Sequence, residues 1–538
     1  MIVRHILSFS LILLISTVYK SVTVNINEDV MIRSAKPIKN KTWENWNGEI
    51  YISPSAIFEP STLEDLIDIV KLAKAKNKTI RCAAQGHTVS SLSVTKNYLV
   101  VVTNLKQITI QKHPKCGWTV TAEAGISLSE LDNALRNHDP PLTLDSEAFL
   151  DIFRVSGVVA VGAHGSKTSS GIMSDQLCSM KIVTGSGEVY EFSEEISKSE
   201  FNAAKVNLGL LGIIYSLTFR AQLMYNLRVN DVYAPITEWF NPQTIKNLLD
   251  SSDGIEMNYY PFNGFNQSDP NPLDPNKDLV LVKNFVRTGE SVSFTQQQIE
   301  KLRETQIQDN INQKKLFKSL LQNPEATPNV SSTIWKSIMS NGNTSFVFQA
   351  PDTFHFIAGY EIVKNHLIEI GFKVDPDFSN VAAEFSHVIQ TVTTASYSGI
   401  SLWDLYEFAR KGKFPLNRVL VIRIIKSTKA LLSNTFDNDP KTLYCHMDFD
   451  SVIGTPGWEE FMQLIAQRYF DKYKAKPHWG KQWEFIPNVK SYLSDVLSDQ
   501  IKQFEKVRAK YDPDKIFFDN KSLQDIFSCA LYSSNSKC

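Results

Sequence analysis

The strongest constraint on the fold of this chain is the alternation of strand-like runs with amphipathic helical segments between about residues 40 and 222. Residues 63–73 repeat apolar side chains at helical spacing, and Ser61-Thr62-Leu63-Glu64 before them has the form of a capping box. Residues 98–103 (YLVVVT) have the composition of a strand buried on both faces. From about residue 223, turn-rich and polar segments interrupt the pattern before strand-like runs return. We therefore expect an α+β protein with an N-terminal module and a second domain.

The same patterns predict the other elements and the limits of the domains. Strands are expected at residues 78–83, 118–122, 181–183, 189–192, 215–220, 279–283, 419–425 and 443–449. Helices are expected at residues 127–137, within 296–330, and at 458–472 and 493–510. We expect a first domain over residues 40–222 and a second over residues 223–527, whose end returns to the first domain.

Charge and cysteine content exclude several classes of protein. The chain has 538 residues, with 56 Lys and Arg against 57 Asp and Glu, so its formal net charge is -1. A protein built mainly to hold nucleic acid needs a basic surface, and we expect no nucleic-acid partner. Six cysteines are too few for a disulfide-stapled scaffold in a chain of this length.

The N-terminus has the form of a targeting segment. Arg4 and His5 precede an uncharged apolar run over residues 6–19, which Lys20 ends. A run of about 14 residues suits a secretory signal and is shorter than the ~20 residues of a spanning helix. We expect residues 1–21 to be a cleaved signal or an uncleaved membrane anchor; the alternative is a buried N-terminal helix or strand.

Six Asn-x-Ser/Thr triplets support entry into the secretory pathway, as a glycoprotein of the cell exterior or of the lumen or membrane of the endoplasmic reticulum. They begin at Asn40, Asn77, Asn266, Asn329, Asn343 and Asn520. In an oxidising lumen Cys529 and Cys538 are close enough in sequence to pair, and the other four cysteines show no obvious bridge.

Several common catalytic motifs are absent. The sequence contains no GxGxxG fingerprint, no GxxxxGK[ST] loop, no HExxH and no GxSxG elbow. Phosphoryl transfer, zinc proteolysis and the common serine hydrolases are therefore disfavoured.

Two segments of small residues are the candidate ligand-binding loops. The first covers residues 79–88 (TIRCAAQGHT) and the second residues 155–166 (VSGVVAVGAHGS). Small side chains let backbone N–H groups approach an anion closely, and a flat ligand could lie against the second segment. The alternative is two tight turns beside a core, with His87 and His164 as structural histidines.

The order of these segments resembles the vanillyl-alcohol-oxidase family of flavoproteins. Residues 81–88 are similar to its Arg-x-x-Gly-x-Gly-His-Ser loop, and Glu123-Ala124-Gly125 and residues 157–165 follow in family order, as do Ser174-Asp175 and residues 208–214. The resemblance covers about residues 40–527. It implies an FAD-binding domain of the PCMH type, a substrate-binding or cap domain, and FAD as the cofactor.

The resemblance also implies which residues hold the cofactor. The loop at 81–88 would bind the FAD pyrophosphate, and His87 stands where many members carry a covalent bond to the flavin, which raises its reduction potential. Ala84 replaces the usual Gly, and Gln85 is bulkier than usual. The cofactor-binding residues implied are Arg81, Ala84, Gln85, Gly86, His87, Thr88, Gly157, Gly162, His164, Gly165 and Ile213.

The C-terminal part resembles the aldonolactone and alditol oxidase branch of the family. Residues 476–481 (KPHWGK) are similar to its Arg-Pro-His-Trp-Gly-Lys motif, which gives Lys481 a place beside the flavin. By the same resemblance Arg423 and Lys481 would stabilise a developing alkoxide, and His446 or Asp448 would hold hydroxyls or relay the proton. The alternative is that Arg423 and Lys481 are partly exposed salt-bridge residues.

One departure from the family bears on the substrate. Val421 stands where both related branches carry a carboxylate, and residues 406–417 resemble a stretch of the flavin-linked cholesterol oxidases. The leading hypothesis is an FAD-dependent oxidase of a sugar 1,4-lactone of the D-arabinono- or L-gulono- type, with O2 as acceptor and H2O2 as product. The first alternative is a sterol or other hydrophobic secondary-alcohol oxidase. The second, of another class, is a secreted binding protein that keeps the flavoprotein fold without turnover.

Overall fold

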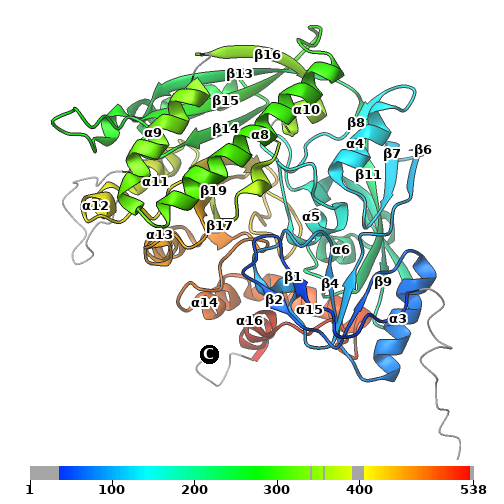
Figure 1. Cartoon of the computed structure of the whole chain (residues 1–538). Helices are drawn as coiled ribbons and strands as arrows, with labels where there is room; N and C mark the ends of the chain where they lie inside the picture. Colours follow the sequence, from blue (N-terminus) through cyan, green and yellow to red (C-terminus); the bar gives the residue numbers. More distant parts are fainter. Residues whose placement is uncertain (1–34, 340–341, 356–357, 390–404, 533–538) are drawn as a thin grey trace, which may run out of the picture.

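The computed structural model describes residues 35–339, 342–355, 358–389 and 405–532. The predicted N-terminal signal and Cys538 lie outside the described residues. The chain forms two domains of mixed helix and sheet, as the sequence predicts, and Figure 1 shows them side by side.

The first domain begins with a small parallel sheet in the strand order β3-β5-β4. Its members are β3 (Ala56–Phe58), β4 (Ile80–Ala83) and β5 (Tyr98–Val101), and α3 (Leu63–Ala75) makes the crossover between β3 and β4. The capping box at the start of α3 uses Thr62 and Asp65, one residue later than predicted. Asp65 also accepts the backbone N–H groups of Ser61 and Thr62, which fixes where the helix begins.

An antiparallel sheet in the strand order β10-β9-β11-β7-β6 completes the first domain. Its strands are β6 (Ile108–His113), β7 (Gly117–Glu123), β9 (Leu177–Val183), β10 (Val189–Ser193) and β11 (Ile213–Arg220). The helices beside it are α4 (Leu128–Arg136), α5 (Val155–Val161) and α6 (Glu194–Ala204). A disulfide between Cys116 and Cys178, which the sequence did not suggest, joins the β6–β7 turn to β9.

The second domain is built on an eight-stranded sheet in the order β16-β13-β15-β14-β18-β19-β17-β20. The strands are β13 (Asn226–Pro235), β14 (Gly254–Tyr259), β15 (Leu279–Thr288), β16 (Thr344–Gln349), β17 (Asn365–Lys373), β18 (Val419–Lys426), β19 (Leu443–Val452) and β20 (Lys476–Pro477). The sequence predicts three of these, at β15, β18 and β19. Short pairs are formed by β1 (Trp43–Glu44) with β2 (Tyr51–Ile52) and by β8 (Leu142–Thr143) with β12 (Gln222–Leu223).

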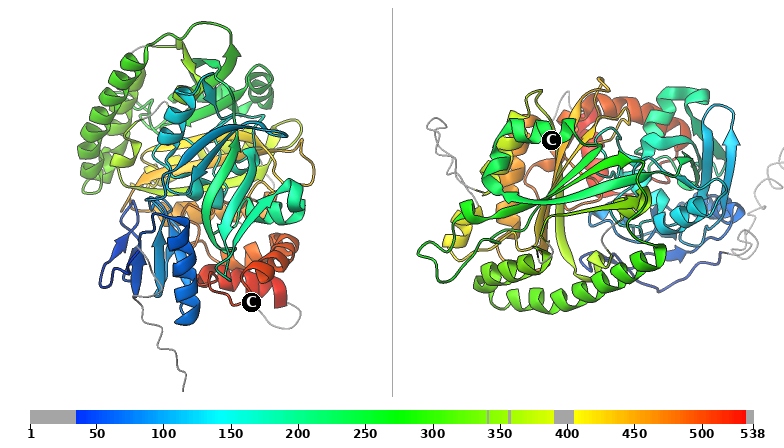
Figure 2. Two further views of the ribbon diagram at one scale, coloured as in Figure 1. Left: turned by 90° about the vertical axis from the view of Figure 1, so that its right-hand side faces the viewer. Right: turned by 90° about the horizontal axis from the view of Figure 1, so that it is seen from above.

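Helices cover both sides of the large sheet, and the views of Figure 2 show its twist. They are α7 (Pro242–Asp250), α8 (Gln296–Leu320), α9 (Thr327–Ile338), α10 (Ala350–Phe354), α11 (Ser379–Ile389), α12 (Leu405–Arg410) and α13 (Trp458–Tyr473). On the face turned away from the first domain, Tyr469 of α13 donates its hydroxyl to Met447 of β19 over 3.0 Å. Asp448 and Asp450 alternate with Met447 along β19, so their side chains lie on the opposite face, which contributes to the site.

The end of the chain packs against the first domain. The helix expected at 493–510 is two helices, α14 (Val489–Val496) and α15 (Ser498–Tyr511), and α16 (Lys521–Tyr532) follows. The break at Leu497 lets both helices turn apolar side chains toward α16. The backbone N–H of Ile80 donates to Ile516 over 2.8 Å, and Figure 1 shows these last helices beside β4.

Two surface expectations can be compared with the structure. Five of the six candidate glycosylation asparagines are exposed, whereas Asn520 is 4% exposed and donates its amide to Ser91. Asn520 is therefore closed to a sugar in the folded protein. Among the described residues, no helix combines the length and the apolar composition needed to cross a bilayer.

Candidate active site

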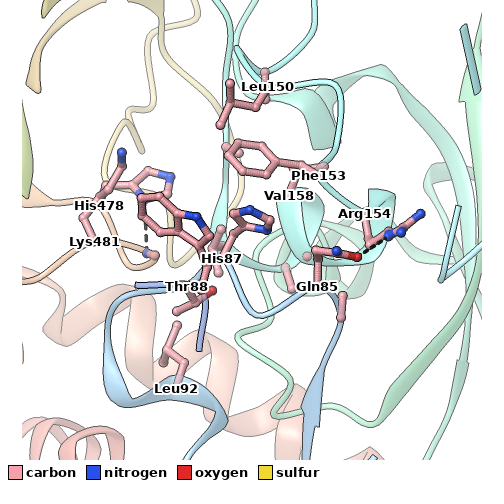
Figure 3. Close-up of a pocket in the computed structure, with 18 of the residues that line it drawn as sticks. Gln85, His87, Thr88, Leu92, Leu150, Phe153, Arg154, Val158, His478 and Lys481 are labelled. Atoms are coloured by element: carbon pink, nitrogen blue, oxygen red, sulfur yellow. Dashed lines mark hydrogen bonds between the residues drawn. The ribbon is translucent and has the colours of Figure 1, made fainter. Parts of the chain in front are cut away.

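A cavity between the two domains brings the predicted residues together. One wall comes from the loop after β4, from α5 and from the start of β11; the other comes from β14, β17, β18, β19 and the turn after β20. Figure 3 shows His87 beside Phe153, with His478 and Lys481 on one side and Arg154 on the other.

The loop after β4 presents backbone donors to the cavity. Within the described part of the chain, the N–H groups of Gln85, Gly86, His87 and Thr88 donate no hydrogen bond to the protein. Gln85 instead uses its side-chain oxygen to accept from Nε of Arg154 over 2.9 Å, which holds the bulky residue against α5 (Figure 3). A row of free N–H groups is what an anionic group such as a pyrophosphate requires.

His87 is held between aromatic rings and keeps both ring nitrogens free of protein partners. It stacks on Trp46 with the ring centroids 5.7 Å apart and meets Phe153 edge-on at 5.1 Å. Both Nδ1 and Nε2 are buried without a hydrogen-bond partner. Burial, and then the charges of Lys364 and Arg154, lower the pKa of His87 to about 4. The imidazole is therefore neutral at physiological pH, with a nitrogen able to bond to a ligand in the cavity.

Several predicted cofactor residues support the loops more than they face the cavity. Arg81 is 2% exposed and donates to the carbonyls of Leu92, Leu208 and Phe517 at 2.7, 2.7 and 2.9 Å, so it ties three segments together. Gly162 and Gly165 lie outside the cavity wall. Gly162 ends α5 with φ of +75°, and a Cβ at Gly165 would overlap the carbonyl of Glu147.

Gly157 and Ile213 do line the cavity, together with Ala84 and His164. A Cβ at Gly157 would meet only the Ala84 methyl, 3.9 Å away, so the space beside this glycine belongs to the cavity. The segment at 155–166, which was expected to form a turn, contains helix α5. Its β-branched residues have a low helix propensity, but their burial in the core of the first domain outweighs it.

The opposite wall is a grid of side chains on four neighbouring strands. Strand register sets Glu256, Arg423, His446 and Gly371 in one row; Asn258, Val421, Asp448 and Glu369 in the second; and Val419, Asp450 and Leu367 in the third. Tyr260, which follows the end of β14, also lines the cavity. All members of the second and third rows line the cavity, and so does Arg423. His446 lies behind the wall, 1% exposed.

A carboxylate reaches Arg423 from the adjacent strand. Nε of Arg423 donates to Oε1 of Glu256 over 3.1 Å, and Ser166 donates to the same oxygen. Both residues of the pair are buried, which excludes the partly exposed salt bridge considered for Arg423. The second row thus has Val421 in place of the family carboxylate, and Arg423 takes its anionic partner, Glu256, from the adjacent strand.

Glu369 was missed by the sequence analysis and organises three histidines. Its Oε1 lies 2.7 Å from Nε2 of His164 and 2.6 Å from Nδ1 of His446. Burial alone would raise the pKa of Glu369, but the neighbouring His164 and His478 and the hydrogen bonds hold it well below its usual range. The carboxylate is ionised, and its ligand atoms with those of His164 and His446 lie within 4.8 Å, close enough for a metal ion.

Lys481 and Asp448 form a charged pair on the wall of the cavity that the second domain provides. Nζ of Lys481 lies 3.3 Å from Oδ2 of Asp448, and Nη1 of Arg423 lies 3.9 Å from that oxygen. Burial alone would lower the pKa of Lys481, but the carboxylates of Asp448, Asp450 and Glu369 raise it. Burial raises the pKa of Asp448 although Lys481 opposes the shift. Lys481 is therefore an ammonium at neutral pH, and Oδ1 of Asp448 is buried without a partner.

These features fit FAD, the cofactor that the family resemblance implies. The free N–H groups of residues 85–88 suit its pyrophosphate, and the unpartnered nitrogens of His87 suit a place beside its ring. The opening next to Gly157 leaves room for a flat group. The charged pair of Asp448 and Lys481 lies on the opposite wall of the same cavity, where a substrate could meet the ring.

Comparison with known families and proteins agrees with this assignment. A family model described as an FAD binding domain matches residues 54–193, and one described as D-arabinono-1,4-lactone oxidase matches residues 274–525. The L-gulonolactone oxidase of Scyliorhinus torazame is 30% identical over 196 residues, which are 36% of this chain and 44% of that protein. This match thus spans less than half of that relative.

Two further relatives match over nearly their whole length. The L-gulono-1,4-lactone dehydrogenase of Mycobacterium tuberculosis is 21% identical over 484 residues, covering 89% of this chain and 97% of that protein. The crystal structure of cholesterol oxidase from B. sterolicum superposes with a TM-score of 0.73 at 17% identity, covering 94% of this chain and 98% of that one. The structural match establishes the shared two-domain fold.

Proposed function

We propose that this chain is an FAD-linked oxidase of the vanillyl-alcohol-oxidase type and that it oxidises a CH–OH group of a sugar 1,4-lactone of the D-arabinono- or L-gulono- type. The observation that carries the proposal is the convergence of Arg423, Asp448 and Lys481 on the cavity that the loop at 85–88 enters from the other side. The names of the relatives support the lactone as substrate.

One wall of the cavity would bind the cofactor, and the other would bind the substrate. Bound FAD would accept the hydride, and its reoxidation by O2 would give H2O2. The N–H groups of residues 85–88 would bind the pyrophosphate, and His87 would meet the ring. We extend the proposal to a covalent bond through His87, because its neutral imidazole has no protein partner.

Asp448 is the proton acceptor that fits best among the three residues considered. Lys481 is already an ammonium, and His446 lies behind the cavity wall. Asp448 lines the cavity with Oδ1 free, and a pKa raised by burial improves a carboxylate as a base near neutral pH. The hydroxyl proton would pass to Oδ1 of Asp448, while Lys481 and Arg423 stabilise the negative charge on the substrate oxygen.

A sterol or another hydrophobic secondary alcohol is the second candidate substrate. Val419 and Val421 form an apolar strip between the polar residues of β14 and β19, and Leu367 and Phe149 add apolar surface. A third candidate is a binding protein that retains the flavin without turnover. The polar, unpartnered groups of the cavity favour the lactone over the sterol.

We also propose that the protein works in the secretory pathway, outside the cell or in the lumen or membrane of the endoplasmic reticulum. The disulfide between Cys116 and Cys178 and the disulfide-bonded state of Cys529 suit an oxidising compartment. The apolar segment at residues 6–19 would deliver the chain there, as a cleaved signal or as an anchor that keeps it at the membrane.

Anaerobic mixing tests the function directly. Purified holoprotein is mixed in turn with L-gulono-1,4-lactone, D-arabinono-1,4-lactone and a sterol, and the oxidised-flavin absorption is followed. Bleaching by a lactone alone is the expected result. Bleaching by the sterol alone would transfer the assignment to the second candidate, and no bleaching by any of them would remove lactone oxidation.

A further inference from the structure

Asp450 is a buried carboxyl group without a protein partner. It is 3% exposed and lines the cavity. Its Oδ1 has no hydrogen-bond partner, and no described residue forms an ion pair with it within 4.0 Å. Asp448, two residues earlier on β19, has Lys481 at 3.3 Å. The protein thus neutralises one carboxylate of the strand and leaves the next one open to the cavity.

No described neighbour forms a hydrogen bond to the side chain of Asp450. Its register partners are Val419 on β18 and Leu367 on β17, which have no side-chain donors. An unpaired buried acceptor is unfavourable unless a ligand supplies a donor. Burial raises the pKa of Asp450 to about 7, although the charge of Lys481 opposes the shift, so near neutral pH the group can accept from a hydroxyl or donate to one.

The position of Asp450 sets which part of a substrate it would meet. Residues two apart on a strand point to the same face about 7 Å from each other. If the reacting hydroxyl lies at Asp448 and Lys481, a group at Asp450 lies toward the far end of the substrate. In a hexono-1,4-lactone the hydroxyls of the open side chain are that distant from the ring hydroxyl at C2.

We propose that Asp450 is a specificity-determining residue that binds a side-chain hydroxyl of a five- or six-carbon aldonolactone. The inference rests on the proposed lactone oxidation and extends it from the reacting carbon to the far end of the substrate. A sterol would place hydrocarbon against this carboxyl group, so the same residue disfavours the second candidate substrate.

The test compares two lactones with the same ring. L-Gulono-1,4-lactone has the hydroxylated side chain, and a tetrono-1,4-lactone of the same ring configuration lacks it. The holoprotein and its Asp450→Ala and Asp450→Asn variants are titrated anaerobically. Two quantities are measured: the Kd, from the perturbation of the flavin spectrum, and the limiting rate of flavin reduction.

The expected result is selective loss of affinity. Asp450→Ala should raise the Kd of the six-carbon lactone about 10- to 100-fold, the range of a hydrogen bond to a charged group, and leave the Kd of the tetronolactone unchanged. Asp450→Asn retains an acceptor oxygen and should recover most of the affinity. The limiting rate of reduction should stay within a few-fold in both variants, because Asp450 does not touch the reacting atoms.

Other outcomes separate the two proposals. Equal weakening of both lactones, or of neither, would overturn the role of Asp450. If the wild type binds the lactones but its flavin is not reduced, the proposal of lactone oxidation is rejected, and the Kd values still test the binding role of Asp450. If the wild type binds no lactone, both proposals fail. Should Asp450→Ala not yield folded holoprotein, Asp450→Leu replaces it, because leucine has a similar size and no acceptor atom. A larger Kd for the six-carbon lactone alone supports the proposal, and unchanged Kd values for both lactones overturn it.

Discussion

Nε of Arg423 lies 3.1 Å from Oε1 of Glu256, and the two residues face each other in register on β18 and β14. This pair shows that the absence of a carboxylate at Val421, where the related branches carry one, does not leave Arg423 without an anionic partner. The arginine keeps a buried anionic partner, which comes from the neighbouring strand. Arg423 is therefore oriented toward the cavity without a carboxylate of its own strand.

Glu256→Gln should slow flavin reduction by lactone about 10- to 100-fold, because Arg423 loses a charged hydrogen bond and its orientation. The measurement is the limiting rate of anaerobic flavin reduction. Val421→Glu is the informative companion, since it restores the carboxylate of the middle row and should tighten lactone binding. Unchanged rates in Glu256→Gln would show that Arg423 needs no anchor.

Lys481→Met should lower the limiting rate of flavin reduction about 10²- to 10³-fold, the size of losing one electrostatic stabiliser of the transition state. The flavin content should be unaffected, because Lys481 lies on the substrate wall. Lys476→Met is a matched control on β20, the strand just before that turn, with its ammonium over the Tyr444 ring rather than in the cavity. An equal loss in both variants would point to damage of the turn.

His87→Ala should yield protein from which acid releases all of the flavin, whereas the wild type should keep a fluorescent flavin on a denaturing gel. The reason is that His87 offers the free imidazole nitrogens beside the cavity. The reduction potential of the variant should be lower, because a covalent bond raises it. Free flavin in the denatured wild type would refute the covalent link and leave the FAD site standing.

Glu384 should make the second domain sensitive to acid. Burial alone would raise its pKa, but hydrogen bonds from Arg468 and Tyr473 hold it below the usual value. The carboxylate therefore stabilises the fold above its unfolded pKa of about 4.3, and this contribution is lost as the pH falls through the lower folded pKa. Glu384→Gln should lower the free energy of unfolding at pH 7 by about 2–4 kcal/mol, measured by denaturant titration.

Glu460→Gln is the matched control for that change. Glu460 pairs with Lys413 at 2.6 Å, but both side chains are nearly half exposed. An exposed pair contributes about 1 kcal/mol or less, so this variant should unfold almost as the wild type does at every pH. Equal losses in the two variants would contradict the assignment of buried charge to Glu384.

The disulfide between Cys116 and Cys178 should stabilise the first domain, since it closes a segment of 62 residues. Replacing both cysteines by serine should lower the free energy of unfolding by about 2–4 kcal/mol. The single variants Cys82→Ser and Cys445→Ser are controls, because neither thiol is bonded to another cysteine. A double variant as stable as the wild type under oxidising conditions would show that the bridge does not form.

Local features were predictable from the sequence where neighbours in the chain decide them. Helix α3 was found because its capping residues and apolar spacing are local, although Ser61–Glu64 and Thr62–Asp65 both satisfy the capping pattern and only the hydrogen bonds choose the second. The cofactor loop was found because small residues and a histidine follow a strand directly.

The residues that the sequence analysis missed depend on long-range pairing. Glu256 and Glu369 lie on β14 (GIEMNY) and β17 (NHLIEIGFK), which are buried on both faces and show no clean alternation. Their roles in the site depend on strand register with β18 and β19, about 80 to 170 residues away in the chain. Asp450 was passed over because nothing in the sequence separates an open carboxyl from a neutralised one.

Because Arg81 contacts Phe517, the first domain can be completed only late in the synthesis of the chain. The two residues are separated by 436 positions. At a synthesis rate of about 5–20 residues per second, a ribosome needs roughly 20–90 s to pass from one to the other. During that interval β4 and its loop exist without the carbonyls of the last segment that fix them. We therefore expect flavin to be loaded only after the polypeptide is finished, and a ribosome-stalled chain lacking the last helices should not acquire the cofactor.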